Sequence, residues 1–110
     1  MEKEIYQLHA SVCQTLSHPK RLEILNTLRD KEMSVGELKK LTGLPKANLS
    51  QHLAILRQKK IVLTRRDGVN IYYRIGNPKV IQACDLMREV LYEQLAEDEK
   101  LAKRLRIKRR

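Results

Sequence analysis

Aromatic and sulfur-containing residues are scarce in this chain of 110 residues. It has no phenylalanine and no tryptophan, four tyrosines and two cysteines. The core must therefore be built from leucine, isoleucine, valine and methionine. Cys13 and Cys84 are too few and too distant in the sequence for a secreted fold held by disulfides. No apolar run is long enough to span a bilayer and no signal-peptide pattern opens the chain, so we expect a cytoplasmic protein without a membrane partner.

The motifs of common enzymes are also missing. The sequence contains no GxSxG, no glycine-rich phosphate loop and no metal-protease motif. A Cys/His nucleophilic pair would need a pocket that a chain this small hardly provides. We therefore expect a single domain, residues 1–110, that is not an enzyme. A core of this size favours oligomerisation.

Positive charge is abundant and unevenly placed. The formal net charge is +10, and residues 39–74 alone carry nine basic residues and one acidic residue. A basic segment of this kind is what neutralisation of DNA phosphates requires. Residues 100–110 add seven basic residues and no acidic one. We expect the tail, residues 103–110, to be solvated, with contact to the DNA backbone as the alternative.

Residues 34–60 have the pattern of a helix-turn-helix. Ser34 followed three residues later by Glu37 is the arrangement of a capping box, in which each residue satisfies a backbone N–H near the start of a helix. This pattern predicts a short helix over residues 35–41. Gly43 then suits the end of that helix and the tight turn to the next one.

The second helix of the pair, residues 45–60, has the pattern of a recognition helix. Pro45 favours a helix start, because its missing N–H would be unpaired in the first turn. One side of the helix is apolar and carries Leu49, Leu53 and Leu56. The other side carries side chains of the kinds that contact phosphates or read base edges, namely Lys46, Asn48, Ser50 and Gln51. His52 is a further candidate for DNA contact, although a structural role is its more frequent use.

Residues 61–75 predict a β-hairpin. Ile61–Arg66 and Ile71–Ile75 are rich in β-branched residues and tyrosine and flank Asp67-Gly68, a hairpin turn signal. A hairpin directly after a helix-turn-helix is a wing, so the expected fold is mainly α with a β-hairpin wing, a winged helix-turn-helix. Its expected order is four helices, two strands and a last helix.

The two ends of the chain predict a dimer interface. Helices are expected over residues 2–16 and about 78–102, with a separate helix starting at Pro19 whose inward residues are Leu22, Leu25 and Leu28. The terminal helices carry apolar seams at Ile5, Leu8, Val12 and Leu16, and at Val80, Cys84, Met87, Leu91 and Leu95. A seam this long is hard to bury in one small monomer, so residues 1–16 and 78–102 are expected to form a homodimer. Two copies would present recognition helices to half-sites roughly 34 Å apart.

Three stretches together resemble the ArsR/SmtB family of small dimeric winged-helix repressors. They are LSHPKRLEILNTL from Leu16, SVGELKKLTGLPKANLSQHLAILRQKKIV from Ser34, and RRDGVNIYYRI from Arg65. The resemblance implies a homodimer that binds a double-stranded DNA operator and is released by an inducer. It also implies that the family's recognition-helix motif lies at Ser50-Gln51-His52-Leu53, and that Arg65, Arg66 and Gly68 belong to the DNA-binding wing.

The resemblance leaves the inducer open. Members of that family commonly sense metals, yet the cysteine pair of one known site is absent around Glu32–Gly36, and residues 75–110 have no histidine for the other. Cys13 and Cys84 remain as possible sensor thiols. They could undergo oxidation or persulfide chemistry, or bind a soft metal ion or arsenite with help from His9. They could equally be small buried hydrophobic residues of a regulator with no thiol or metal sensing. We expect that no cofactor is required.

A different class of function stays open at this point. A basic module of this size could bind RNA or an acidic protein partner. A preference of about tenfold or more for one duplex over random DNA would exclude that alternative.

Overall fold

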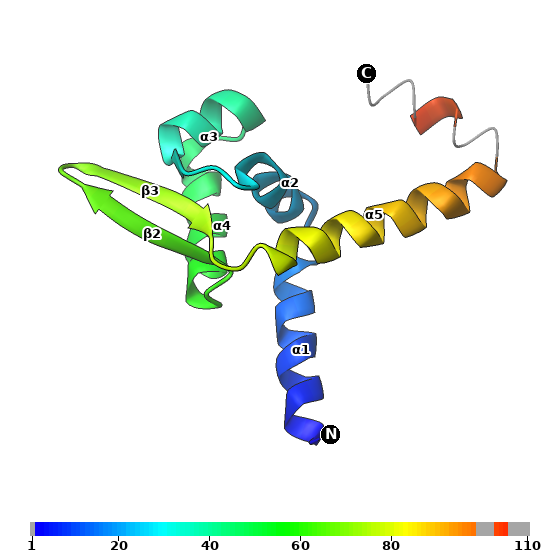
Figure 1. The fold of residues 1–110 in the computed structure, drawn as a ribbon. Helices are drawn as coiled ribbons and strands as arrows, with labels where there is room; N and C mark the ends of the chain where they lie inside the picture. The colour runs from blue at the N-terminus through cyan, green and yellow to red at the C-terminus, as the bar shows by residue number, and fades with distance from the viewer. Residues whose placement is uncertain (1, 99–102, 106–110) are drawn as a thin grey trace.

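Three helices of the computed structural model pack around one apolar core, beside a small antiparallel sheet (Figure 1). The structure describes residues 2–98 and 103–105. Two further helices, α1 and α5, extend from this body in different directions. The elements are α1 (Lys3–Leu16), α2 (Pro19–Leu28), β1 (Met33–Ser34), α3 (Val35–Thr42), α4 (Lys46–Gln58), β2 (Val62–Asp67), β3 (Asn70–Ile75) and α5 (Lys79–Glu97). The predicted winged helix-turn-helix is confirmed.

The core is aliphatic, as the absence of phenylalanine and tryptophan requires. Helices α2, α3 and α4 and strand β2 supply its fully buried side chains, which are Ile24, Leu25, Leu28, Leu38, Leu49, Leu53, Leu56 and Val62. The predicted apolar side of α4 is therefore correct at all three leucines. In α2 the prediction is wrong at one position, because Ile24 is fully buried while Leu22 is only half-buried.

The turn between α3 and α4 is held by the groups that the sequence indicated. The Ser34 Oγ accepts a hydrogen bond from the Glu37 backbone N–H at 3.2 Å, and the Ser34 N–H donates to a Glu37 carboxylate oxygen at 3.1 Å. Gly43 ends α3 with φ = 73°, a left-handed conformation that glycine adopts without a Cβ penalty. Pro45 lies one residue before the helix, as its N-cap. These features define the turn that sets the orientation of α4 relative to α3.

The sheet contains a strand that was not predicted. Met33 is buried, and Met33–Ser34 form β1, which pairs with β3. The strand order is β1-β3-β2. Strands β2 and β3 are antiparallel, and the pair Asp67 and Asn70 closes the hairpin. Gly68, with φ = 64°, supplies the left-handed residue that this tight turn needs.

The terminal helices differ from the prediction in which residues they bury. Ile81 is the buried residue of α5, although it was not placed in the seam, and Val80 packs against the core. Farther along α5, Leu86, Met87, Val90, Leu91 and Tyr92 are exposed, as are Ile5, Tyr6 and Leu8 of α1. Val12 and Leu16 pack against the core instead. The first turn of α5 thus packs against the chain's own core, and the residues from Leu86 onward leave an apolar strip uncovered.

Two predictions concern the C-terminal residues. The last helix was expected to reach residue 102, but α5 ends at Glu97 and residues 99–102 lie outside the described residues. Of the basic tail, residues 103–105 are helical, and 106–110 are likewise not described. Within the described residues, no helix is long and apolar enough to cross a membrane.

Candidate nucleic-acid interface

The solvent side of α4 carries the residues that the sequence proposed for base reading. Ser50 and Gln51 are exposed, as are Lys46 and Asn48 nearer the helix N-terminus. Their positions follow from the buried leucines, since the core holds one side of the helix and turns the opposite side to solvent. Hydrogen-bonding side chains near the N-terminus of an exposed helix are what a recognition helix presents to base edges.

The exposed side of α4 also carries two alanines that were not among the predicted site residues. Ala47 and Ala54 are exposed and lie one helical turn before and after Ser50 and Gln51. Small side chains at these positions leave room for the helix to approach a groove floor, and an alanine methyl can contact the thymine methyl. The sequence could have indicated them, because positions 47, 50, 51 and 54 lie three or four residues apart and therefore share one face of a helix.

His52 points toward the neighbouring helix α2. Arg21 donates a hydrogen bond from its Nε to the His52 Nδ1 at 3.2 Å and another from Nη1 to the Thr15 carbonyl at 3.1 Å. The rings of His18 and His52 lie 4.6 Å apart. Burial, followed by the charges of His18, Arg21 and Lys20, lowers the pKa of His52, which keeps the Nδ1 able to accept the bond. This geometry gives His52 a packing role between helices, in line with the structural alternative.

The wing arginines point to opposite faces of the hairpin. Val62 faces the core, and side chains alternate along a strand, so Arg66 shares the face of Val62 while Arg65 lies on the other. Arg65 forms an ion pair with Glu32, with Nη2 at 2.6 Å from one carboxylate oxygen. The Arg66 side chain is exposed, and it makes no hydrogen bond or ion pair within the part of the chain that the structure describes. The two residues are therefore unequal candidates for phosphate contact.

The wing tip is fully open to solvent. Val69 is 97% exposed and follows Gly68 in the turn. The tip projects beyond the helices in Figure 1, on the side away from α5. Gly68 shapes this tip through its left-handed conformation, and its part in DNA binding stays a prediction.

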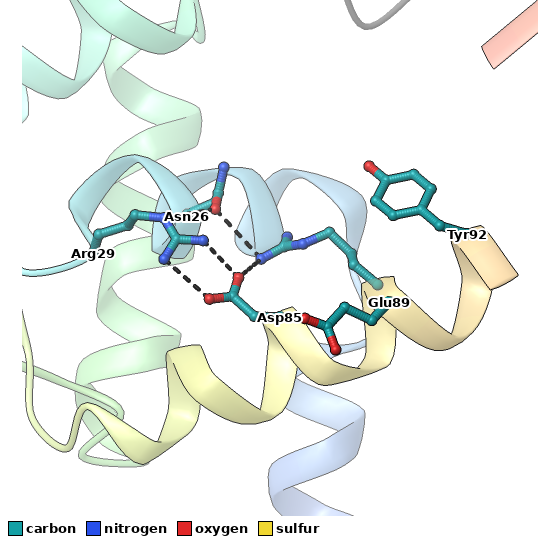
Figure 2. A pocket seen from close by; sticks show the side chains of 6 residues that line it. Asn26, Arg29, Asp85, Glu89 and Tyr92 are labelled. Atoms are coloured by element: carbon teal, nitrogen blue, oxygen red, sulfur yellow. Dashed lines mark hydrogen bonds and ion pairs between the residues drawn. The ribbon is translucent and has the colours of Figure 1, made fainter. Parts of the chain in front are cut away.

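A polar cluster joins the end of α2 to α5 (Figure 2). The Asp85 carboxylate accepts hydrogen bonds from Arg29 at 3.1 and 2.5 Å and from Arg88 at 2.8 Å. The Asn26 side-chain oxygen accepts from both arginines as well. These arginines lower the pKa of Asp85 to about 2, so the carboxylate stays charged at neutral pH. The cluster lines an open cavity of about 510 Å³ and ties the core to the helix that carries the uncovered apolar strip.

The cysteines lie on the two terminal helices as free thiols. Cys13 is exposed on α1 and Cys84 is half-buried on α5. Burial raises the pKa of Cys84 above the ordinary range. In the described part of the chain, no three side chains of His, Cys, Asp or Glu come together as a metal site. Cys13, Cys84 and His9 are therefore not a preformed ligand set within one protomer.

The helix-turn-helix, its exposed polar face and the adjoining hairpin define a winged helix-turn-helix DNA-binding protein. A family model described as "Bacterial regulatory protein, arsR family" matches residues 18–63. The HTH-type transcriptional regulator Rv0081 of Mycobacterium tuberculosis is 40% identical over 99 residues, covering 88% of this chain and 87% of the relative. The chain belongs to the ArsR family of bacterial transcriptional regulators. That family consists of DNA-binding regulators, so the protein is not an enzyme.

Other relatives extend this comparison. The biofilm growth-associated repressor of Xylella fastidiosa is 39% identical over 94 residues, covering 86% of this chain and 82% of the relative. The crystal structure of M. tuberculosis Rv0081 superposes with a TM-score of 0.78 at 38% identity, covering 88% of this chain and 98% of that one. The homodimeric winged helix-turn-helix domain of Mb0332 from Mycobacterium bovis gives a TM-score of 0.75 at 30% identity, covering 84% of this chain and 85% of that one.

Proposed function

We propose that the protein is a homodimeric transcriptional repressor that binds a double-stranded operator. In this proposal Ser50 and Gln51 of α4 read bases in the major groove, and Lys46 and Arg66 contact phosphates. The observation that carries it is the two-sided character of α4, with three fully buried leucines on one side and a polar, exposed face on the other. Because the target is chromosomal DNA, the proposed site of action is the cytoplasm.

The exposed apolar strip supports the dimer. Met87, Val90 and Leu91 lie three and four residues apart on α5, so their side chains form one exposed face, and α1 adds Ile5 and Leu8. An exposed apolar helix face of this kind is typical of an interaction site. The relative Mb0332 is described as homodimeric, and the relative from Xylella fastidiosa as a repressor. A dimer would bury the strip and pair the two recognition helices.

Selection from a random duplex library tests the binding proposal. We expect the purified protein to enrich a sequence with two related half-sites and to bind it about tenfold or more tightly than a random duplex of equal length. Two chains should bind each duplex in the titration. Equal binding of selected and random duplexes would instead favour a basic module for RNA or an acidic protein partner.

For release from the operator we propose a thiol-reactive inducer sensed by Cys13 and Cys84. Support comes from their placement on α1 and α5, the helices assigned to the dimer interface, where a changed thiol would alter helix packing. Treatment with a polysulfide, an oxidant or arsenite is expected to weaken operator binding. Because the raised pKa of Cys84 leaves little thiolate at neutral pH, its reaction should keep accelerating as the pH rises beyond the ordinary thiol range.

The control for this response is the double variant Cys13→Ser, Cys84→Ser. It should bind the selected duplex as the wild type does and should no longer respond to the reagents. If it responds unchanged, the cysteines are packing residues, and the protein is a regulator with no thiol sensing. A response of the wild type to arsenite alone would favour the metalloid alternative.

A further inference from the structure

Glu32 and Arg65 form an ion pair across the outer face of the sheet. The Arg65 Nε donates to both Glu32 carboxylate oxygens at 3.1 Å, and Nη2 donates to one of them at 2.6 Å. The guanidinium carbon also lies 4.9 Å from the centre of the Tyr72 ring. Arg65 thus reaches from β2 across β3 to the residue that precedes β1.

The strand register explains why these groups meet. Arg65 is the partner of Tyr72 in the β2–β3 ladder, and Tyr72 is the partner of Ser34 in the β3–β1 ladder. Paired residues point to the same face, and Glu32, two residues before Ser34, points there too. The contact therefore depends on β1, the strand that the sequence did not predict.

This ion pair occupies the part of Arg65 best suited to a phosphate. The Nε and Nη2 of a guanidinium can bind two oxygens of a carboxylate or of a phosphate in the same forked geometry. Glu32 already fills that edge, and its negative charge cancels the charge that would attract the DNA backbone. The Arg65 side chain is nonetheless 50% exposed, so a phosphate can approach it and compete.

We propose that Glu32 is a positioning residue that lowers the affinity of the wing for DNA by acting as the main internal counter-ion of Arg65, since the Asp67 carboxylate lies farther away, at 4.0 Å from Nη1. This inference rests on the proposed DNA-binding function, and it adds to that function a residue outside the helix-turn-helix. Arg66, on the other face, attracts phosphates at all times, whereas Arg65 does so only where a phosphate outcompetes Glu32. Contacts to the DNA backbone carry no base information, so the effect of Glu32 on affinity should be the same for all DNA sequences.

Glu32→Gln tests the proposal, because glutamine keeps the shape and removes the charge. We expect about threefold tighter binding to both the selected and the random duplex, the size expected for an exposed ion pair. The plot of log affinity against log salt should steepen by up to about one per chain, and so by up to about two for the dimer, since each wing has one more cation free to neutralise phosphate. Asp30→Asn is the matched control: it removes an exposed carboxylate two residues away that forms no ion pair with Arg65 in the described part of the chain, and its effect should be smaller.

Arg65→Ala separates this role from a general loss of negative charge. In the Arg65→Ala background, adding Glu32→Gln should bring no further gain in affinity and no change in salt slope. A gain that persists without Arg65, or a Glu32→Gln protein that binds random duplex no more tightly than wild type, overturns the proposal. If the wild type fails to prefer the selected duplex, the operator proposal fails, while the random-duplex comparison still decides the role of Glu32.

Discussion

Leu91→Glu is expected to convert the protein into a folded monomer and to lower its affinity for a duplex with two half-sites by about a hundredfold or more. Leu91 is 47% exposed and lies outside the core, so the change should leave each chain folded. In the proposed dimer the new carboxylate would be buried without a partner in an apolar interface, which is strongly unfavourable. Loss of the second recognition helix removes the gain from simultaneous binding of two half-sites, typically 10²–10⁴.

Sedimentation velocity and a duplex titration measure this outcome. Gln82→Glu is the matched control, because it introduces the same charge at an exposed position on the opposite side of α5. The control should remain dimeric and bind normally. A Leu91→Glu protein that stays dimeric with unaltered operator affinity would show that the exposed strip of α5 is not the dimer interface.

Gln51→Ala is expected to lower affinity for the selected duplex by about tenfold or more while leaving random-duplex binding nearly unchanged. A bidentate contact between a side-chain amide and a base contributes about 1–3 kcal/mol of discrimination, and it is made twice in a dimer. Gln51 is exposed on α4, so its truncation should change the free energy of unfolding little.

Gln58→Ala provides the comparison, since it removes the same side chain from an exposed position in the last turn of α4. It should leave both affinities close to wild type. If Gln51→Ala weakened binding to random and selected duplexes equally, Gln51 would be a backbone contact, and base reading would have to lie elsewhere on the helix.

Local features of the fold could be predicted from the sequence because their causes are local. The capping box of Ser34 and Glu37, the left-handed Gly43 and the three leucines of α4 are each set by neighbours within a few residues. The same holds for the exposed face with Ser50 and Gln51, since helical periodicity fixes it once the buried side is known.

Contacts between distant segments could not be predicted in this way. Glu32 meets Arg65 only because β1 pairs with β3, and a two-residue strand is too short to leave a period in the sequence. Arg29 meets Asp85 only because the end of α2 lies beside α5. The apolar period of α5 likewise does not reveal which part faces the chain's own core, so Ile81 was missed.

Helix α5 is attached to the rest of the chain at two places near its start, and its second half extends beyond them. Its first turns are anchored in the core at Ile81 and tied to α2 through Asp85, while Leu91 lies ten residues beyond that anchor, about 15 Å along a helix. In the proposed dimer, a rearrangement between the two copies at Leu91 would act on α2 through these contacts and, through the shared core, would change the spacing and tilt of the paired α4 helices.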